Sequence, residues 1–458
     1  MSSFVVAKKK NLLSIAGVYL VIIFFFSLIN IWLNMSLGSA ILFYVYIVSI
    51  FMFDKMLLLK YLHVFYAGIF AITATLIIEY SNIYLPELWK NSFPAHSTTL
   101  LVIWYSLIII TIQNRENKTK MTNNKYGDIK YSKSTRMALR ILLTLLVVGL
   151  FSASLTYFLQ IVKQPYWILN IRRFAYKQRY FDSLMLIFFT SFIYAVPVLL
   201  KEKRHFLKIL SVVSILLYLA SCVLYGEKFN AFWQVGIILI FYNLNKNINI
   251  PNLFQKYKKY FFLVFLLVIA LLTYTIMQYT ILNVDPLTSL VNRMAQQGQL
   301  WWGTYSGVNA NGAHPFEFFD EILNPIFNPH GYDYSVYKIM YFNAPQSVVD
   351  SVISSGSAYT ESTAATFYYY FDFLGIIIFA PLIGLLWSWV TNYLLHLFST
   401  ESIIETVLVC RLYFIISAIS TNSRFYNLFD IQSILTIVFI AFVYLSNRKR
   451  VLVRGLVS

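Results

Sequence analysis

The chain has 458 residues, of which 59% are apolar and only 12% are Asp, Glu, Lys or Arg. That charged fraction is about half of what a soluble domain carries, so the soluble, disordered and disulfide-scaffold classes are excluded. The 36 basic and 19 acidic residues leave a net charge of +17, which gains meaning only once it is divided between two sides of a membrane. Cys222 and Cys410 both lie inside apolar runs and define neither a disulfide framework nor a metal site.

The apolar residues gather in twelve segments that are long enough, or nearly so, to cross a bilayer as helices of about 20 residues. Helices are the expected element, because the edges of an open sheet cannot be satisfied in lipid. The first segment follows Lys8–Lys10 and is too long for a signal-peptide core, so we expect it to be retained. The spans are predicted near residues 12–33, 37–53, 61–80, 99–112, 141–162, 184–200, 209–225, 230–244, 260–282, 374–396, 403–420 and 431–446.

These spans predict an all-α polytopic membrane protein with about 12 transmembrane helices and one large periplasmic loop. Residues 1–282 are expected to form transmembrane helices 1–9, with a basic periplasmic loop at 163–183. Residues 283–366 are expected to form the large periplasmic loop with short helices, and residues 367–458 the last three transmembrane helices and a cytoplasmic tail.

The basic residues are distributed unevenly between the connecting segments. With both termini in the cytoplasm, 25 of them lie on the inner side, 10 lie on the outer side, and Arg411 lies within a span. This arrangement follows the positive-inside rule. The strongest block, Asn114–Arg140, is interpreted as a solvated cytoplasmic linker, so no nucleic-acid partner is expected.

Half of the outer basic residues lie in the loop Lys163–Ser183, against the usual charge rule. Arginine offers a planar fork that matches phosphate oxygens, and several arginines together can offset the charge of a diphosphate. Contact with anionic lipid head groups is the alternative explanation. The cluster consists of Lys163, Arg172, Arg173, Lys177 and Arg179.

The large loop is acidic and rich in aromatic residues, amides and turns. Rings that stack on sugar faces, together with polar groups for the hydroxyls, are typical of carbohydrate binding, whereas an interfacial aromatic belt is the structural alternative. At helical spacing Arg293, Gln297 and Trp301 would share one face, next to Trp302. Turns that divide the loop into short helices are expected at Asn324-Pro325, Asn328-Pro329 and Ala344-Pro345.

No segment resembles a P-loop, a dinucleotide fingerprint, a Ser–His–Asp elbow or a zinc motif, so neither a cofactor nor a metal is expected. His314 and His330, the two histidines of the large loop, lack ligand spacing. Arg411 follows Glu405 by six residues, a spacing that suits no pair on one helix. Partners on other helices are therefore expected for Arg411, in a functional role or in a buried structural pair.

The layout and several short motifs resemble the bacterial oligosaccharide repeat-unit polymerases, the Wzy-type polymerases of O-antigen and capsule synthesis. The resemblance covers most of the chain by topology, whereas its sequence elements are short. These elements are Asn170–Tyr176, Gly226–Phe229, Asn292-Arg293, Gln297–Trp302, Ser357–Glu361 and Phe373–Gly375.

The resemblance implies an inverting, membrane-embedded glycosyltransferase with a GT-C-like fold in the bacterial inner membrane. It would transfer a growing glycan en bloc from undecaprenyl diphosphate to a single lipid-linked repeat unit at the periplasmic face. Neither a nucleotide sugar nor a metal would be needed. Membrane lipids and a polysaccharide chain-length regulator are the implied partners.

In such a reaction negative charge develops on the leaving diphosphate, and pre-placed cations stabilise it. Arg172, Arg173 and Arg179 are assigned to that role, with Lys228 and Arg293 in support. The remaining predicted substrate-binding residues are Lys177, Gln297, Trp301, Trp302, Tyr359, Arg411 and Arg424.

The acceptor hydroxyl must lose its proton to a general base near the anomeric carbon. Glu361 is the first candidate, and Glu227 and His314 are the alternatives. A capping role at the start of the following helix, near Thr360–Thr363, is the structural alternative for Glu361.

Three other functions compete with polymerisation. An O-antigen ligase would transfer the glycan to the lipid A-core and differs little in sequence pattern. A flippase for lipid-linked oligosaccharides typically has two similar helix bundles and no large outer loop, and no similarity between the two halves is visible here. A transporter of small anions would place its charge near the membrane midplane rather than at the outer face.

Overall fold

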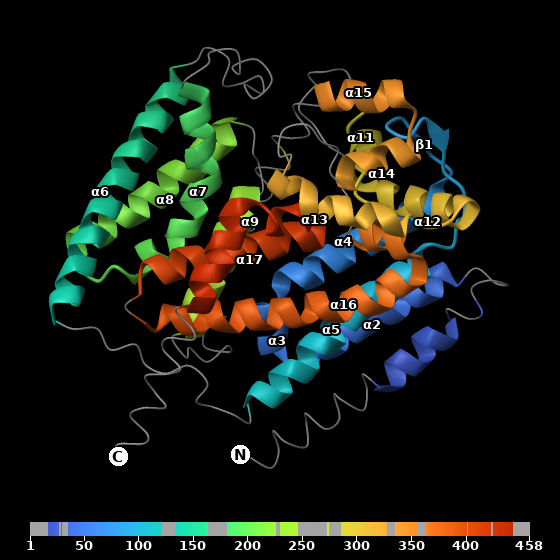
Figure 1. Ribbon diagram of the computed structural model, residues 1–458, viewed down its shortest axis with the longest axis horizontal. Coiled ribbons are helices and arrows are strands. Elements are labelled where there is room, and N and C mark those ends of the chain that lie inside the picture. The colour runs from blue at the N-terminus through green and yellow to red at the C-terminus, as the bar shows by residue number, and fades with distance from the viewer. Residues whose placement is uncertain are drawn as a thin grey trace. The chain divides into compact units, whose positions relative to one another are not determined.

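The computed structural model describes residues 17–26, 29, 35–120, 133–163, 181–225, 230–245, 273, 285–327, 335–354, 363–400, 402–422 and 425–442. These residues are helical apart from loops and one hairpin of two short antiparallel strands, β1 (Tyr84–Leu85) and β2 (Lys90–Asn91) (Figure 1). The all-α prediction is therefore confirmed. Within this part of the chain five helices are long and apolar enough to cross a membrane: Ser36–Phe53, Leu62–Ser81, Met137–Val162, His205–Val223 and Thr363–Phe398.

The chain forms two compact units, each assembled from separate stretches of sequence. The first unit comprises Met1–Asn123, Leu272–Val390 and Tyr413–Ile437. The second unit comprises Asn124–Leu271, Thr391–Leu412 and Val438–Ser458.

Three helices of the first unit, α2 (Ser36–Phe53), α4 (Leu62–Ser81) and α5 (Thr98–Lys120), lie side by side (Figure 1). The short helix α3 (Lys55–Lys60) joins α2 to α4. Near the end of α4 the carboxylate of Glu79 accepts hydrogen bonds from the backbone N–H and hydroxyl of Ser97, at 2.6 and 2.8 Å, and from the hydroxyl of Thr98, at 2.9 Å. A carboxylate at this position satisfies the free N–H groups of the first turn of α5.

The rest of the first unit is built largely from short helices. Gly303 of α12 lies against α14, where a Cβ atom would approach the side-chain oxygen of Asn343 to 2.5 Å. A turn separates α14 from α15 at Ala344-Pro345, as predicted. The turn predicted at Asn324-Pro325 is wrong, because Pro325 lies inside α13, where it leaves one carbonyl of the preceding turn without its helical hydrogen bond. The short elements are α11 (Pro286–Ala295), α12 (Gln299–Asn311), η2 (Pro315–Glu317), α13 (Phe318–Phe327), α14 (Ser335–Asn343) and α15 (Gln346–Ser354).

The long helix α16 (Thr363–Phe398) is broken at Asp372, which has φ 53° and ψ −143°. The rings of Phe367 and Phe379, on opposite sides of Asp372, stack with their centroids 4.0 Å apart. Residues so far apart in sequence could not touch along a straight helix, so the break is sharp. Gly375 is required there, because a Cβ atom would overlap the carbonyl oxygen of Phe367. The part after the break is about 39 Å long, enough to cross the hydrocarbon of a bilayer. It is followed by α17 (Ile404–Asn422), η3 (Phe425–Leu428) and an apolar helix, Ile431–Phe442.

The second unit contains α6 (Lys133–Val162), α7 (Phe181–Lys201), α8 (His205–Tyr225) and α9 (Asn230–Asn245), with the end of α16 and the start of α17. Lys201 at the end of α7 donates hydrogen bonds to the carbonyl oxygen of Leu397, at 2.6 Å, and to the hydroxyl of Thr406, at 2.8 Å. A lysine at the C-terminal end of α16 satisfies a free carbonyl and complements the helix dipole.

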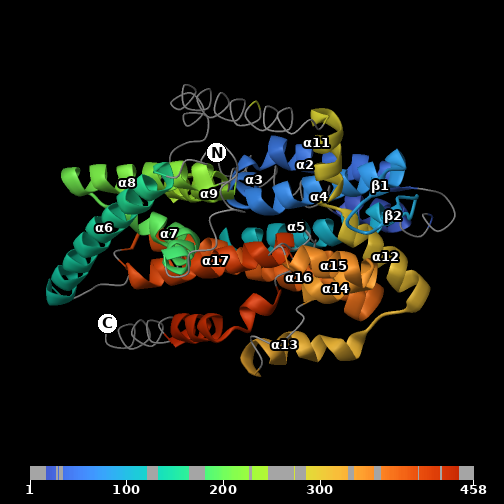
Figure 2. The ribbon, with the colours of Figure 1, turned by 90° about the horizontal axis from the view of Figure 1, so that it is seen from above.

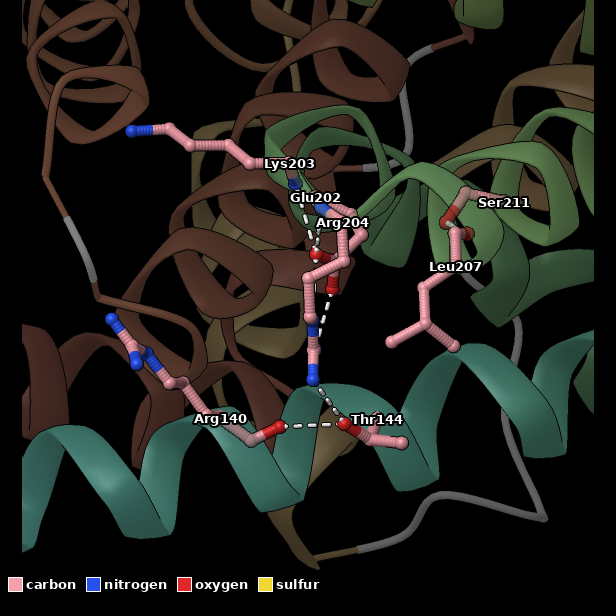
Figure 3. Close-up of polar contacts among 7 residues, drawn as sticks. All are labelled: Arg140, Thr144, Glu202, Lys203, Arg204, Leu207 and Ser211. Atoms are coloured by element: carbon pink, nitrogen blue, oxygen red, sulfur yellow. Dashed lines mark hydrogen bonds and ion pairs between the residues drawn. The ribbon is translucent and has the colours of Figure 1, made fainter.

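A charged joint, Glu202–Arg204, connects α7 to α8 (Figure 3). Glu202 accepts hydrogen bonds from the backbone N–H groups of Lys203 and Arg204, both at 2.9 Å, and from the guanidinium of Arg204 at 2.7 and 3.0 Å. Arg204 also donates to the hydroxyl of Thr144 on α6, at 2.9 Å. The Arg204 hydrogen bonds lower the pKa of Glu202, against the opposing effect of burial. The joint therefore fixes three helices through a carboxylate and a guanidinium that are both paired.

Candidate functional site

The candidate site lies in the first unit, where α12, α13 and α14 meet the start of α16. Its base is anchored by two tryptophans of α12, which are fully buried. The indole N–H of Trp301 donates to the carbonyl oxygen of Ser97, at 3.2 Å, and that of Trp302 donates to the carbonyl oxygen of Phe93, at 3.0 Å. Both rings, predicted to bind sugar, thus pack against the segment before α5, and their direct role in binding stays a prediction.

The expected common face of Arg293, Gln297 and Trp301 does not form, because these residues do not lie on one helix. Helix α11 ends at Ala295, a turn follows, and α12 begins at Gln299. Gly298 in that turn lies against the backbone of α4, where a Cβ atom would approach the backbone nitrogen of Thr75 to 2.7 Å. Packing against α4 therefore interrupts the helix that the local spacing favours.

A cluster around His314, called the His314 cluster, brings α14, α16 and the segment before α13 together. The imidazole stacks on the ring of Tyr369, with centroids 4.7 Å apart and an interplanar angle of 14°. Its Nδ1 lies 3.4 Å from Oε1 of Glu317. The hydroxyl of Tyr369 donates to Oε2 of the same carboxylate at 3.0 Å, and Nζ of Lys338 lies 3.8 Å from it. Lys338 also pairs with Asp320 at 2.9 Å.

The two nitrogens of His314 have different surroundings. Nδ1 faces the Glu317 carboxylate, whereas Nε2 is shielded from solvent and has no hydrogen-bond partner among the described residues. A carboxylate beside Nδ1 favours the tautomer with its proton on that nitrogen, which leaves Nε2 as an acceptor. A buried acceptor without a partner is costly, and a ligand hydroxyl would supply the missing hydrogen bond. In this tautomer Nε2 can accept the proton of a hydroxyl that reaches it.

A second polar group, the Glu87 cluster, lies where the β1–β2 hairpin meets α11 and α12. The side-chain amide of Gln299 donates a hydrogen bond to Glu87, and its own carbonyl oxygen has no partner among the described residues. Burial raises the pKa of Glu87, although the hydrogen bond from Gln299 and the charge of Arg293 act in the opposite direction. Burial also lowers the pKa of Lys90, whose ammonium lies 5.6 Å from the ring centroid of Trp302. The structure thus places Arg293 near an acid that no spacing in the sequence indicated.

Between the anchoring tryptophans and the break in α16 lies a pair of stacked tyrosines. The rings of Tyr305 and Tyr368 have centroids 5.4 Å apart, and Tyr368 donates a hydrogen bond to Asn309 at 2.8 Å. Burial raises the pKa of Tyr305. The strained backbone of Asp372, one turn after Tyr368, costs about 1–3 kcal/mol and is the kind of outlier that gathers at functional sites.

His314 is the one predicted general base among the described residues, and its surroundings come from Glu317, Lys338 and Tyr369, which the sequence did not single out. Gln297 lies half-buried in the turn before α12, and Arg411 lies half-buried in α17. Glu405 accepts a hydrogen bond from Tyr393, on another helix. No group of three or more His, Cys, Asp or Glu residues in the described part of the chain is arranged to hold a metal. The predicted site residues outside the described ranges are Arg172, Arg173, Lys177, Arg179, Glu227, Lys228, Tyr359, Glu361 and Arg424.

Comparison with known proteins gives one match. Residues 329–438 match the model of a family described as a family of unknown function, DUF6418. No curated protein and no solved structure matches the chain. The matched segment contains Lys338, Tyr369 and the break at Asp372, whereas His314 lies before it. The chain is thus similar to this family over the part that packs against the His314 cluster.

Proposed function

We propose that the protein is a membrane-embedded glycosyltransferase that polymerises oligosaccharide repeat units carried on undecaprenyl diphosphate. The observation that carries the proposal is the buried Nε2 of His314, which has no partner among the residues that the structure describes, with the Glu317 carboxylate at Nδ1. A transferase that joins sugars needs an acceptor for the proton of a hydroxyl, and an imidazole held by a carboxylate is suited to that task. Helices long enough to cross a membrane support a lipid-linked substrate.

In the proposed reaction the acceptor hydroxyl attacks the anomeric carbon of the donor glycan. Its oxygen forms the new glycosidic bond, the bond from the anomeric carbon to the diphosphate oxygen breaks, and the diphosphate leaves with the electron pair. The hydroxyl proton passes to Nε2 of His314, and Glu317 stabilises the imidazolium that results. The anomeric configuration inverts, because attack and departure occur on opposite faces. Arg172, Arg173 and Arg179 remain the proposed partners of the leaving diphosphate.

Deleting the gene and examining the surface polysaccharide on a gel tests the proposed function. For an O-antigen, loss of a polymerase should leave the core capped with a single repeat unit. A bare core with polymer retained on the carrier lipid would indicate a ligase, and carrier-linked units that accumulate inside the cell would indicate a flippase. Either of the last two results would overturn the proposal.

Purified protein in vesicles gives a second test. With labelled lipid-linked repeat units as the only substrate, longer lipid-linked glycans and free undecaprenyl diphosphate should appear together. The release of the diphosphate without chain growth would mean hydrolysis rather than transfer, and would contradict the mechanism above.

A further inference from the structure

The α13 helix and the turn before it carry an apolar stripe that no described residue covers. Phe316, Phe319 and Phe327 expose 88%, 63% and 78% of their surface, and Leu323 exposes 47%. Their spacing of three and four residues places them on one face of a helix. Isolated exposed apolar residues are ordinary, but a continuous stripe of large aromatic side chains marks an interaction surface.

A different face of α13 packs against the start of the membrane-length part of α16. The ring of Phe318 lies with its centroid 4.9 Å from that of Phe371 and 5.9 Å from that of Phe379. Phe379 belongs to the apolar part of α16 that follows the break at Asp372. Helix α13 also contacts η3, which directly precedes the apolar helix Ile431–Phe442. The stripe is therefore held beside the ends of two apolar helices.

The third face of α13 is polar, and its Asp320 is paired within the protein, as is Glu317 of the preceding turn. Asp320 accepts a hydrogen bond from Lys338 at 2.9 Å, and Glu317 lies within 3.8 Å of the same ammonium. Helix α13 contains no Lys or Arg, so it has no cation that would attract anionic lipid. The helix has one side against the protein, one polar side and one apolar side, as helices at membrane surfaces have.

The apolar part of α16 presents the same kind of surface next to α13. Leu374, Ile378 and Leu382 are exposed at four-residue spacing, as expected for a stripe that faces acyl chains. Seen from above, α13 lies on the outer side of α14, α15 and α16, away from α2 and α4 (Figure 2). The exposed side of α13 thus continues a surface that lipid would cover.

We propose that α13 lies in the interface of the bilayer, with Phe316, Phe319, Leu323 and Phe327 inserted among the upper acyl chains. The attachment is hydrophobic, because the polar face is acidic and carries no Lys or Arg, so it requires no anionic lipid. His314 precedes Phe316 by two residues and would be held near head-group depth. The lipid contact itself does not rest on the proposed function. The significance of that depth for His314 does rest on it, because the diphosphate of a lipid-linked glycan lies at the depth of the head groups.

Site-directed fluorescence on the full chain tests the lipid contact. Cys222 and Cys410, both buried, are replaced by Ala, and single cysteines are placed at Phe319 or Phe327 and labelled with bimane. Asn311, exposed at the end of α12, is the matched control. The labelled protein is reconstituted at low density into phosphatidylcholine vesicles that carry a nitroxide lipid labelled near the head-group end of its acyl chain.

The labels at positions 319 and 327 should lose at least half of their fluorescence to the nitroxide lipid and resist iodide in the water. The label at position 311 should behave in the opposite way. Adding anionic lipid or salt should leave this pattern unchanged. Iodide quenching at positions 319 and 327 equal to that at 311 would overturn the proposal, and so would protection from both quenchers, which indicates a protein cover. A label at Leu323 replaces one at Phe319 if that variant does not fold, and none of these readouts depends on glycan synthesis.

Discussion

Two charged regions of this protein, the Glu202–Arg204 joint and the His314 cluster, use similar side chains in opposite ways. At the joint both carboxylate oxygens of Glu202 accept hydrogen bonds, and the guanidinium of Arg204 donates to two partners. In the His314 cluster the carboxylate of Glu317 is held by neighbours, but Nε2 of His314 is buried and finds no partner in the described part of the chain. A fully paired network stabilises a fold, whereas an unpaired buried acceptor reduces stability unless a ligand completes it.

A substitution at His314 gives the most direct test of the difference between the two regions. The His314→Gln variant should lower polymer formation by at least about 100-fold, because general base catalysis contributes about that much or more. Its protein level should stay near wild type and its melting temperature should fall only slightly, because the variant loses the stacking on Tyr369 and the imidazole contact with Glu317 but no hydrogen bond from Nε2 to the described protein. Polymer length on a gel and transfer by purified protein measure the effect.

The matched control is His205→Gln, which changes an exposed imidazole at the start of α8. That variant should polymerise normally. If His314→Gln polymerises at the wild-type rate, His314 is not the base, and Glu361 and Glu227 return as the candidates. An equal loss of activity and of folded protein would assign His314 a structural role.

A substitution in the Glu202–Arg204 joint should lower the stability of the protein rather than its activity. Glu202→Ala leaves the Arg204 guanidinium and two backbone N–H groups without their acceptor, at a cost of about 2 kcal/mol. Thermal unfolding in detergent should show a lower melting temperature. Lys203→Ala is the control, because this side chain is exposed while its backbone N–H keeps its partner (Figure 3). Equal melting temperatures for the two variants would contradict the role given to the joint.

The joint should also make stability depend on pH. Because the folded protein lowers the pKa of Glu202 below its ordinary value of 4.5, its contribution is fully present above that value. The contribution is lost as the pH falls through the lowered pKa. The melting temperature of the wild type should therefore fall more steeply below pH 4.5 than that of Glu202→Gln, whose side chain does not titrate. Parallel curves would show that the joint contributes nothing to acid stability.

The smallest effect is expected at the Glu87 cluster. Since the folded protein raises the pKa of Glu87 above 4.5, the ionised form is disfavoured at neutral pH. Glu87→Gln should raise the melting temperature slightly at pH 7, and the gain should vanish in acid, where the native carboxyl is protonated. A variant that is less stable at pH 7 would mean that the charge pair with Arg293 outweighs the cost of burial.

How much of the fold was predictable depends on the range of the interactions. The spans expected at 37–53, 61–80 and 209–225 correspond to α2 (Ser36–Phe53), α4 (Leu62–Ser81) and α8 (His205–Tyr225). Their helical state follows from local composition, because an apolar stretch in lipid must satisfy its hydrogen bonds within itself. The count of twelve spans and their orientation stay predictions.

The candidate site was far less predictable, because its parts are distant in the chain. Gln299 donates to Glu87 across 212 residues, and no spacing rule joins two such positions. Arg293 and Trp301 were expected on one helix, but the contact of Gly298 with α4 divides that stretch into two helices. A close approach between backbones is a property of packing, and it overrode the local helical preference.

The sequence by itself determined that this is an all-helical chain suited to a membrane, since charge content and apolar run length are read locally. It also named His314 as one of three possible bases. Only the tertiary structure decided which groups surround that imidazole, because Tyr369 of α16 stacks on it, Glu317 of η2 faces its Nδ1, and Lys338 of α14 lies beside the Glu317 carboxylate. The chemistry of a side chain comes from its type, but its protonation and its partners come from neighbours that folding brings together.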